Sequence, residues 1–304
     1  MEKRESLPRK FRSLSDFHRV FGHMMPFHPL VSLVDLSSTE ILPDESFHSF
    51  TTDFYQIIYK PEMHGKVRYG QSHYDFAEGG LTFLAPNQIL EAPPSGKKSG
   101  YVLSIHPDFL LSYPLAKKIK QQGFFSYATN EALHLSSSEK ETILSIFKII
   151  DDELKSRLDD LSHEVIISQL ELLLNYCNRF YKRQFITRQA VNNDMLARME
   201  AVLDAYFNED ESLGKVLPTV QHLADQLNTS PSYLSDMLRS FTGQNAQQHI
   251  HSKLIEKAKE KLSTTENSIS EIAYLLGFEH PQSFSKFFRA KTNISPSEFR
   301  QSFN

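Results

Sequence analysis

The chain has 304 residues, more than one typical domain, and its 40% hydrophobic and 23% charged residues are an ordinary balance for a folded protein, so we expect two or three modules and little disorder. The single cysteine, Cys177, excludes an intramolecular disulfide and a cysteine-based zinc site. No apolar run approaches 18 residues, which predicts a cytoplasmic protein with no signal peptide, membrane span or membrane partner. The net charge of −4 is uneven, because residues 215–304 hold 10 Lys and Arg against 8 Asp and Glu, whereas the other 214 residues hold 23 against 29.

Short apolar runs separated by turn residues extend from about residue 28 to 106 and are typical of β-strands. The clearest runs are LVSLVDL at 30–36, FYQIIY at 54–59, LTFLAP at 81–86 and YVLSIH at 101–106. Gly79-Gly80 and Pro93-Pro94 predict turns between them. Several short strands joined in this way favour a small sandwich or barrel.

The period of the apolar residues becomes helical after about residue 138. Ser138 and Glu141 have capping-box spacing at the start of a first helix, and a second helix follows with Ile166, Leu170, Leu173 and Cys177 on one face. These two helices, within residues 138–181, fit a dimer surface or simple packing on the core equally well. The polar stretch 182–194 has no sustained period and is predicted to be a linker.

The C-terminal part contains an internal repeat. The first half of each copy shares four small or apolar positions at an offset of 49 residues: Val220, Leu223, Ala224 and Leu227 correspond to Ile269, Ile272, Ala273 and Leu276. After a turn the offset becomes 50, so that Pro231, Leu234, Ser235, Arg239 and Thr242 correspond to Pro281, Phe284, Ser285, Arg289 and Thr292. One residue has therefore been added in the second turn.

Each copy has the pattern of a helix-turn-helix unit. Pro231 and Pro281 suit the first position of a helix, where the missing N–H costs nothing. A short helix, a turn and such a second helix form a motif whose second helix can enter the major groove of DNA. A single motif of this kind is common in proteins that never bind DNA. Two copies on one connector helix, about 245–263, suit successive major grooves about 34 Å apart.

The stretch from Ile269 to Arg300, ISEIAYLLGFEHPQSFSKFFRAKTNISPSEFR, resembles the signature of the AraC/XylS family of bacterial transcription regulators, and the resemblance covers about residues 195–304. Asn293 stands where that family usually has glycine, and asparagine also tolerates a left-handed helix end. The segment YDFAEGGLTFLAPNQ at 74–88 resembles, more loosely, the cupin-like sensing and dimerisation domain of some members.

The resemblance implies an α+β chain. Its front part would be a β-rich cupin-like barrel with an N-terminal arm at 1–137, followed by a helical dimerisation pair at 138–181 and the linker at 182–194. An all-α DNA-binding domain would follow at 195–304, with helix-turn-helix units at about 219–243 and 268–292. It further implies double-stranded DNA, RNA polymerase and a second copy of the chain as partners, and a transcription activator, with repression left open. A small-molecule effector at the front domain is a further expectation. Its binding residues are not identified, because aromatic residues such as Tyr55, Tyr59 and Phe83 fit a pocket and a packed core equally well.

We call the second helix of each unit, which begins at Pro231 or Pro281, its reading helix. Side chains early on the two reading helices are candidates for base contacts: Ser232, Ser235 and Asp236 in the first unit, and Gln282, Ser283 and Lys286 in the second. Gln282 can pair with adenine and Lys286 can donate to guanine. Asp236 can accept from a cytosine amino group, but its charge repels phosphates, so we expect weaker reading by the first unit. Phosphate-contact candidates are Arg239, Arg289 and Lys291, although each basic residue also fits an ordinary solvated surface.

Two other classes of function compete with this interpretation. A metal-dependent cupin enzyme is disfavoured because His64 and His73 are nine residues apart and form no His-x-His pair, so we expect no metal, no cofactor and no catalytic residue. An interaction protein whose helical domain merely folds is the third class. Salt discriminates it, because DNA binding weakens steeply as salt rises.

Overall fold

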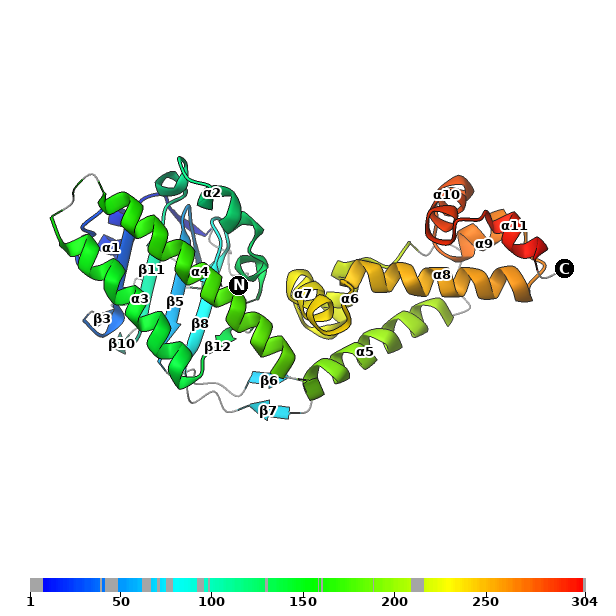
Figure 1. The fold of residues 1–304 in the computed structure, drawn as a ribbon, viewed down its shortest axis with the longest axis horizontal. Helices are drawn as coiled ribbons and strands as arrows, with labels where there is room; N and C mark the ends of the chain where they lie inside the picture. The colour runs from blue at the N-terminus through cyan, green and yellow to red at the C-terminus, as the bar shows by residue number, and fades with distance from the viewer. Residues whose placement is uncertain are drawn as a thin grey trace, which may run out of the picture. The chain divides into compact units, whose positions relative to one another are not determined.

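The computed structural model describes residues 8–38, 40–41, 49–61, 67–69, 72–74, 79–91, 96–97, 99–128, 131–157, 159, 161–187, 189–208 and 216–302. The chain divides into two compact units, Met1–Thr187 and Arg188–Asn304. The first unit combines β-sheets with helices and the second is helical within the described residues (Figure 1).

A five-stranded antiparallel sheet forms the centre of the first unit. Its strand order is β12-β8-β5-β11-β2, and the strands are β2 (Val31–Asp35), β5 (Tyr55–Lys60), β8 (Gly80–Leu84), β11 (Tyr101–Ile105) and β12 (Leu133–His134). The four predicted strands are thus confirmed. Gly79 precedes β8 with a φ of +80°, and a Cβ there would lie 2.5 Å from the carbonyl oxygen of Lys60, so this position requires glycine. The turn predicted there stays a prediction, because residues 75–78 lie outside the described residues. Pro93-Pro94 lies outside the described residues.

The remaining described strands form smaller sheets. They are β1 (Arg9–Phe11), β4 (Ser49–Thr52) and β9 (Leu90–Glu91) in one sheet, β3 (Glu40–Ile41) with β10 (Gly96–Lys97), and β6 (Val67–Tyr69) with β7 (Ser72–Tyr74). In the described part of the chain, β12 and β2 are the unpaired edges of the five-stranded sheet, so its strands form no closed barrel. The expected cupin-like barrel is therefore not confirmed, and only the β-sheet character of the N-terminal region is.

One face of the central sheet packs against two long helices, α3 (Ser137–Lys155) and α4 (Ser162–Thr187), which lie side by side across it (Figure 1). Tyr101 contacts Phe147 of α3 edge-on, and Phe83 contacts Tyr181 of α4. The aromatic residues Phe54, Tyr55, Tyr59 and Phe83 are all buried. The side chains of the other aromatics considered for a pocket, Tyr69, Tyr74 and Phe76, lie outside the described part.

One local prediction for these helices was wrong, and one stretch is more helical than its sequence indicated. The capping box of α3 is formed by Ser136 and Glu139, two residues before the predicted pair, because the serine run 136–138 offers more than one start of the same spacing. The stretch 182–194 is helical up to Thr187 and again from Gln189 in α5 (Gln189–Asn208), although the division into units also falls within it. A linker there stays a prediction.

The N-terminal segment forms an element that the sequence did not indicate. Strand β1 runs parallel to β4, and α1 (Leu14–Val20) follows it with the side chain of Ser13 accepting from the backbone N–H of Asp16 at 3.2 Å. A buried aromatic cluster holds this segment in place: Phe11, Leu14, Phe17, Phe21, Phe50 and Phe54. Short helical turns complete the unit: η1 (Leu36–Ser38), η2 (Pro107–Leu110), α2 (Leu115–Lys118), η3 (Ile119–Gln121) and η4 (Gly123–Ser126).

The second unit contains α5 and six further helices within its described residues. They are α6 (Val220–Leu227), α7 (Pro231–Thr242), α8 (Ala246–Thr264), α9 (Ile269–Leu275), α10 (Pro281–Thr292) and α11 (Pro296–Gln301). The long helix α8 packs against α6 and α7 and also against α9 and α11 (Figure 1). It therefore joins the two halves of the predicted repeat as a single rigid element.

Candidate nucleic-acid interface

The two halves of the repeat have the same helix boundaries. Ser230 caps α7, its Oγ accepting from the backbone N–H of Tyr233 at 3.2 Å, and Pro231 occupies the first turn. Pro281 occupies the same place in α10. Both second helices end in the left-handed conformation, at Gly243 and Asn293, with φ of 80° and 65°. The predicted proline starts and the left-handed end at Asn293 are confirmed.

The turns inside the units differ by the one residue that the offsets predicted. The first helix of each unit ends at a left-handed residue, Asn228 or Gly277, at equivalent positions. The following residues donate to equivalent carbonyls, Thr229 to Ala224 and Phe278 to Ala273, each at 3.0 Å. Two residues then separate Asn228 from Pro231, and three separate Gly277 from Pro281. The added residue thus lengthens the turn without changing how either helix ends.

The repeat extends to a third helix in each unit. Helix α8 begins with a capping box of Asn245 and Gln248, and α11 begins with the equivalent box of Ser295 and Glu298. Helix α9 begins with a further capping box, of Ser268 and Glu271. Each repeat is therefore a three-helix unit, and α8 is both the third helix of the first unit and the connector.

Buried apolar side chains hold the second helix of each unit, α7 and α10, in place. On α7, Leu234 and Leu238 are fully buried, and Tyr233 is 3% exposed. On α10, Phe284 and Phe288 are fully buried, whereas Phe287 is only partly buried. Three residues of α8 join the second core on one stripe: Leu254, Ala258 and Leu262. Because both cores contain α8, the two reading helices have a fixed relation within this unit.

The exposed face of α10 is basic and polar. Gln282, Lys286 and Arg289 follow one another at intervals of four and three residues, so they share one side of the helix, with Ser283 at its edge. All four side chains are exposed. Within the described residues no ion pair joins a carboxylate to Lys286 or Arg289, although Glu298 lies near enough to Arg289 for their charges to interact. This face thus presents hydrogen-bond donors and positive charge to a negatively charged partner with a groove that admits a helix.

The equivalent face of α7 is more buried and electrically balanced. Ser232, Ser235 and Asp236 are half-buried, and Arg239 is exposed on the same side. The guanidinium Nη1 of Arg239 lies 3.3 Å from the Oδ1 of Asp236. This pair was not foreseen, although the i,i+3 spacing of acid and base signals it in the sequence.

Two further basic residues lie elsewhere. Lys291 is nine positions after Gln282 and therefore on the opposite side of α10. Burial lowers the pKa of His251 on α8, and the charge of Lys291 lowers it further, so Lys291 lies toward α8. Arg300 was not singled out in the sequence. Its Nη2 donates to the carbonyl of Asn267 at 2.7 Å and its Nε to that of Leu262 at 3.3 Å, which ties the end of α8 to the start of α9.

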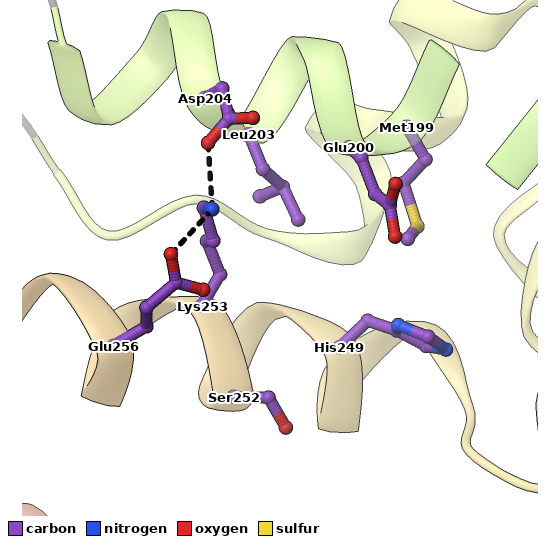
Figure 2. Close-up of a pocket in the computed structure, with 8 residues that line it drawn as sticks. All are labelled: Met199, Glu200, Leu203, Asp204, His249, Ser252, Lys253 and Glu256. Carbon is purple, nitrogen blue, oxygen red and sulfur yellow. Dashed lines mark hydrogen bonds and ion pairs between the residues drawn. The ribbon is translucent and has the colours of Figure 1, made fainter. Parts of the chain in front are cut away.

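A cavity of about 320 Å³ lies between α5 and α8 (Figure 2). The Nζ of Lys253 is held by the carboxylates of Asp204 at 2.7 Å and Glu256 at 3.0 Å. Glu200 and His249 line the same cavity, and burial lowers the pKa of His249. Carboxylates outnumber cations on this side, which makes it unsuited to phosphates. No sequence pattern indicated this cavity.

The described part of the chain contains neither a membrane span nor a cluster of metal ligands. None of its helices is long and apolar enough to cross a membrane. No group of three or more His, Cys, Asp or Glu side chains there is placed to hold a metal ion. His64 and the side chain of His73, considered as metal ligands, lie outside the described residues.

Known proteins resemble the C-terminal part. Residues 223–302 match a family described as "Helix-turn-helix domain". The "Raffinose operon transcriptional regulatory protein RafR" of Pediococcus pentosaceus is 34% identical over 98 residues, covering 32% of this chain and 34% of that protein. The "HTH-type transcriptional activator RhaS" of Salmonella schwarzengrund (strain CVM19633) is 30% identical over 141 residues, 46% of each chain.

Among solved structures, the C-terminal domain of the two-component response regulator yesN from Fusobacterium nucleatum is 31% identical and covers 33% of this chain and 96% of that chain, with a TM-score of 0.29. This chain spans about a third to a half of the length of the curated relatives it matches. The match covers both three-helix units except the first turn of α6. The chain therefore carries a C-terminal helix-turn-helix domain of the AraC type.

Proposed function

We propose that this chain is a sequence-specific DNA-binding transcription regulator that inserts α7 and α10 into successive major grooves. The observation that carries the proposal is the duplication of one three-helix unit on the single helix α8. A packed helical bundle has no need of two equivalent exposed helices, whereas two helices at a fixed separation fit one face of B-DNA.

The side chains on α10 support base reading. Gln282 can pair with the N6 and N7 atoms of adenine, and Lys286 can donate to guanine, while Ser283 is short and unselective. On α7 the corresponding readers are Ser232, Ser235 and Asp236. Arg239 and Arg289 are proposed phosphate contacts, and the contact of Arg289 fixes the register of the protein on DNA without specifying sequence. Lys291 was also predicted to contact a phosphate, but it lies on the side of α10 opposite Gln282 and so faces away from a groove that Gln282 enters.

The outward sides of α3 and α4 support a dimer. Ile149, Val165 and Leu172 are 45%, 38% and 42% exposed. Val165 and Leu172 are seven residues apart on α4 and so lie on one stripe. We propose that this helical pair, predicted at 138–181, joins two copies of the chain, so that the two DNA-binding units of a dimer reach a pair of sites.

The front sheet supports control by a small polar molecule. Ser32, Ser104 and Gln56 face one another across β2, β11 and β5, and each is at most 3% exposed. Gln56 donates to Ser104 at 3.3 Å. Ser32 also bonds to the Nε2 of His18 at 3.0 Å. An effector with hydroxyl groups would have to replace these buried contacts, and its binding would change whether the DNA-binding units reach their sites together. The name of RafR refers to an operon for raffinose, a molecule of that chemistry.

Activation through contact with RNA polymerase is the proposed outcome, and a repressor that blocks a promoter is the alternative. RhaS bears the name of an activator. Transcription in vitro from a template carrying the bound site, with and without the protein, distinguishes the two.

The test is selection of bound duplexes from a random DNA pool by the purified full chain, followed by footprinting at two salt concentrations. We expect two motifs about one helical turn apart and binding that weakens as salt rises. A flat salt response would favour an interaction protein instead. If the full chain enriches no motif, selection with residues 195–304 alone decides whether the front domain was holding the DNA-binding domain back.

The competing function, a metal-dependent enzyme, is tested by metal analysis and by the effect of a chelator. Stoichiometric Fe, Mn or Zn in the purified protein, together with loss of DNA binding on chelation, would revive it. We expect DNA binding that is indifferent to chelator.

A further inference from the structure

The two reading helices carry opposite charges at one equivalent position. Position 236 on α7 corresponds to position 286 on α10 at the repeat offset of 50 residues, and these positions hold Asp and Lys. Three residues later both helices have an arginine, Arg239 and Arg289. Since the helix starts and ends also correspond, the difference at this position is a difference in chemistry and not in placement.

The negative charge of Asp236 pairs with Arg239 and so competes with DNA phosphates for that guanidinium group. In the first unit Arg239 Nη1 lies 3.3 Å from Asp236 Oδ1, with the two side chains 59% and 31% exposed. Arg289 has no such acid three residues before it, because Lys286 occupies that place. The first unit therefore presents a neutral pair to DNA where the second presents two positive charges.

We propose that Asp236 makes the first unit specific for cytosine at the place where the second unit, through Lys286, reads guanine. The inference rests on the proposed function and deepens it. A carboxylate accepts from the N4 amino group of cytosine, whereas an ammonium group donates to the O6 and N7 atoms of guanine. Guanine and thymine present acceptors to a side chain in the major groove and repel a carboxylate, and adenine places its N7 acceptor beside its N6 donor, which disfavours a carboxylate relative to cytosine.

The ion pair couples this base contact to a backbone contact. When Asp236 accepts from cytosine, Arg239 is released to a neighbouring phosphate, and the protein gains one charge-assisted contact. On any other base the carboxylate keeps its arginine and the phosphate contact is not made. One base pair is thus read twice, once by the carboxylate and once by the arginine that it releases.

A consequence for the DNA site follows directly. The two half-sites are not identical direct repeats, because equivalent positions carry cytosine in one and guanine in the other. Two further unlike pairs, Ser232 against Gln282 and Tyr233 against Ser283, add other differences between the half-sites.

The test compares selected motifs for the full-length wild type and for Asp236→Lys, with Lys286→Asp as the matched exchange in the second unit. We expect cytosine at one position of the first half-site, replaced by guanine in Asp236→Lys, and the converse replacement in the second half-site of Lys286→Asp. The wild type should prefer its base by roughly 5- to 150-fold, the range for one well-formed base contact. Asp236→Asn keeps the shape of the side chain and should shift the preference toward adenine.

The coupling has a separate readout in salt titrations. On DNA without the cytosine, Asp236→Ala should steepen the dependence of log affinity on log salt by about 0.9, because Arg239 is then free to bind a phosphate. Arg239→Ala should weaken wild-type binding to the cytosine site but leave binding to the other sites unchanged. An Arg239→Ala effect of equal size on all sites would overturn the coupling.

The possible failures are distinguishable. A wild-type motif that is unchanged in both Asp236→Lys and Asp236→Asn, with both variants folded by circular dichroism, overturns this inference and leaves the proposed function intact. The absence of any wild-type motif from the full chain and from residues 195–304 overturns the proposed function and this inference together.

Discussion

Side chains three or four residues apart on α10 have different tasks in the proposed DNA complex. Gln282 and Lys286 face base edges, and Arg289, one turn further on, reaches the phosphates. Since Phe284 and Phe288 fill the core between them, none of the three exposed residues is needed for folding. Their effects on DNA binding and on stability are therefore separable.

We predict that Gln282→Ala or Lys286→Ala relaxes recognition at particular base pairs and costs about 1–3 kcal/mol on the preferred site. Arg289→Ala should instead weaken all duplexes alike and lower the salt slope by about 1. Quantitative binding to a panel of single-base variants measures both effects. Silence of all three substitutions would show that α10 is not the reading helix.

A second prediction concerns the buried imidazole of His23, which is 8% exposed and lies 5.6 Å from the ring of His18. Burial, with a smaller effect of His18, lowers its pKa from 6.5 to about 4. Because the unfolded chain binds the proton more readily, the stability that neutral His23 confers is complete above pH 6.5 and is lost as pH falls through about 4.

We expect the thermal unfolding temperature of the front unit to fall over this range, with at most about 3 kcal/mol of the loss due to His23. His23→Gln cannot be protonated and should flatten the fall. Identical pH profiles of the two proteins would contradict this assignment.

At the scale of elements, the left-handed helix ends give a matched pair of substitutions. Gly243 and Asn293 occupy equivalent positions, and an added Cβ at Gly243 would meet no atom within 4 Å. Asn293→Gly should be neutral or slightly stabilising, whereas Asn293→Val should cost about 1–2 kcal/mol, because a branched residue resists this conformation. Thermal unfolding measures both, and Gly243→Asn is the control, expected to be tolerated. An unchanged melting temperature in Asn293→Val would refute the argument.

The repeat could be predicted from the sequence because its signals are local. Proline starts, small residues at helix crossings and leucines at equal spacing do not depend on the rest of the fold. The helical character of 182–187 was missed for the opposite reason. Gln184 lies on the buried stripe of α4, where it is 1% exposed, and it bonds to the backbone of Ala132 and His134. A polar residue satisfied by a distant strand interrupts the apolar period.

The start of α3 shows a similar limit. Ser136 and Ser138 both precede a glutamate at the capping distance, so the sequence alone offers two equivalent caps. Arg183 decides between them through a contact 44 residues away, since its Nε donates to Glu139 at 3.0 Å. The unforeseen Asp236–Arg239 pair was, by contrast, within reach of the sequence.

At the scale of the whole molecule, the proposed dimer predicts a link between assembly and DNA affinity. Leu172→Glu or Ile149→Glu places a charge on the outer side of the helical pair and should yield monomers by sedimentation equilibrium. Binding to a double site should weaken by about 10²-fold or more through loss of the linked second contact, while binding to a single site stays unchanged. Ser137→Glu, at the exposed first turn of α3, is the control. Variants that remain dimeric would place the interface elsewhere.

Helix α8 is shared by both DNA-reading units, with Ile250 buried near its start and Leu262 in the core of the second unit. Its 19 residues span about 28 Å, and each residue turns the helix by about 100°. An extra residue in its middle would therefore swing α10 away from the groove that α7 selects. On the DNA, one inserted base pair rotates the second half-site by about 35°. In the proposed complex a promoter can therefore change one base within a half-site at a cost of about 1–3 kcal/mol, whereas the spacing of its half-sites can change only together with the length of this helix.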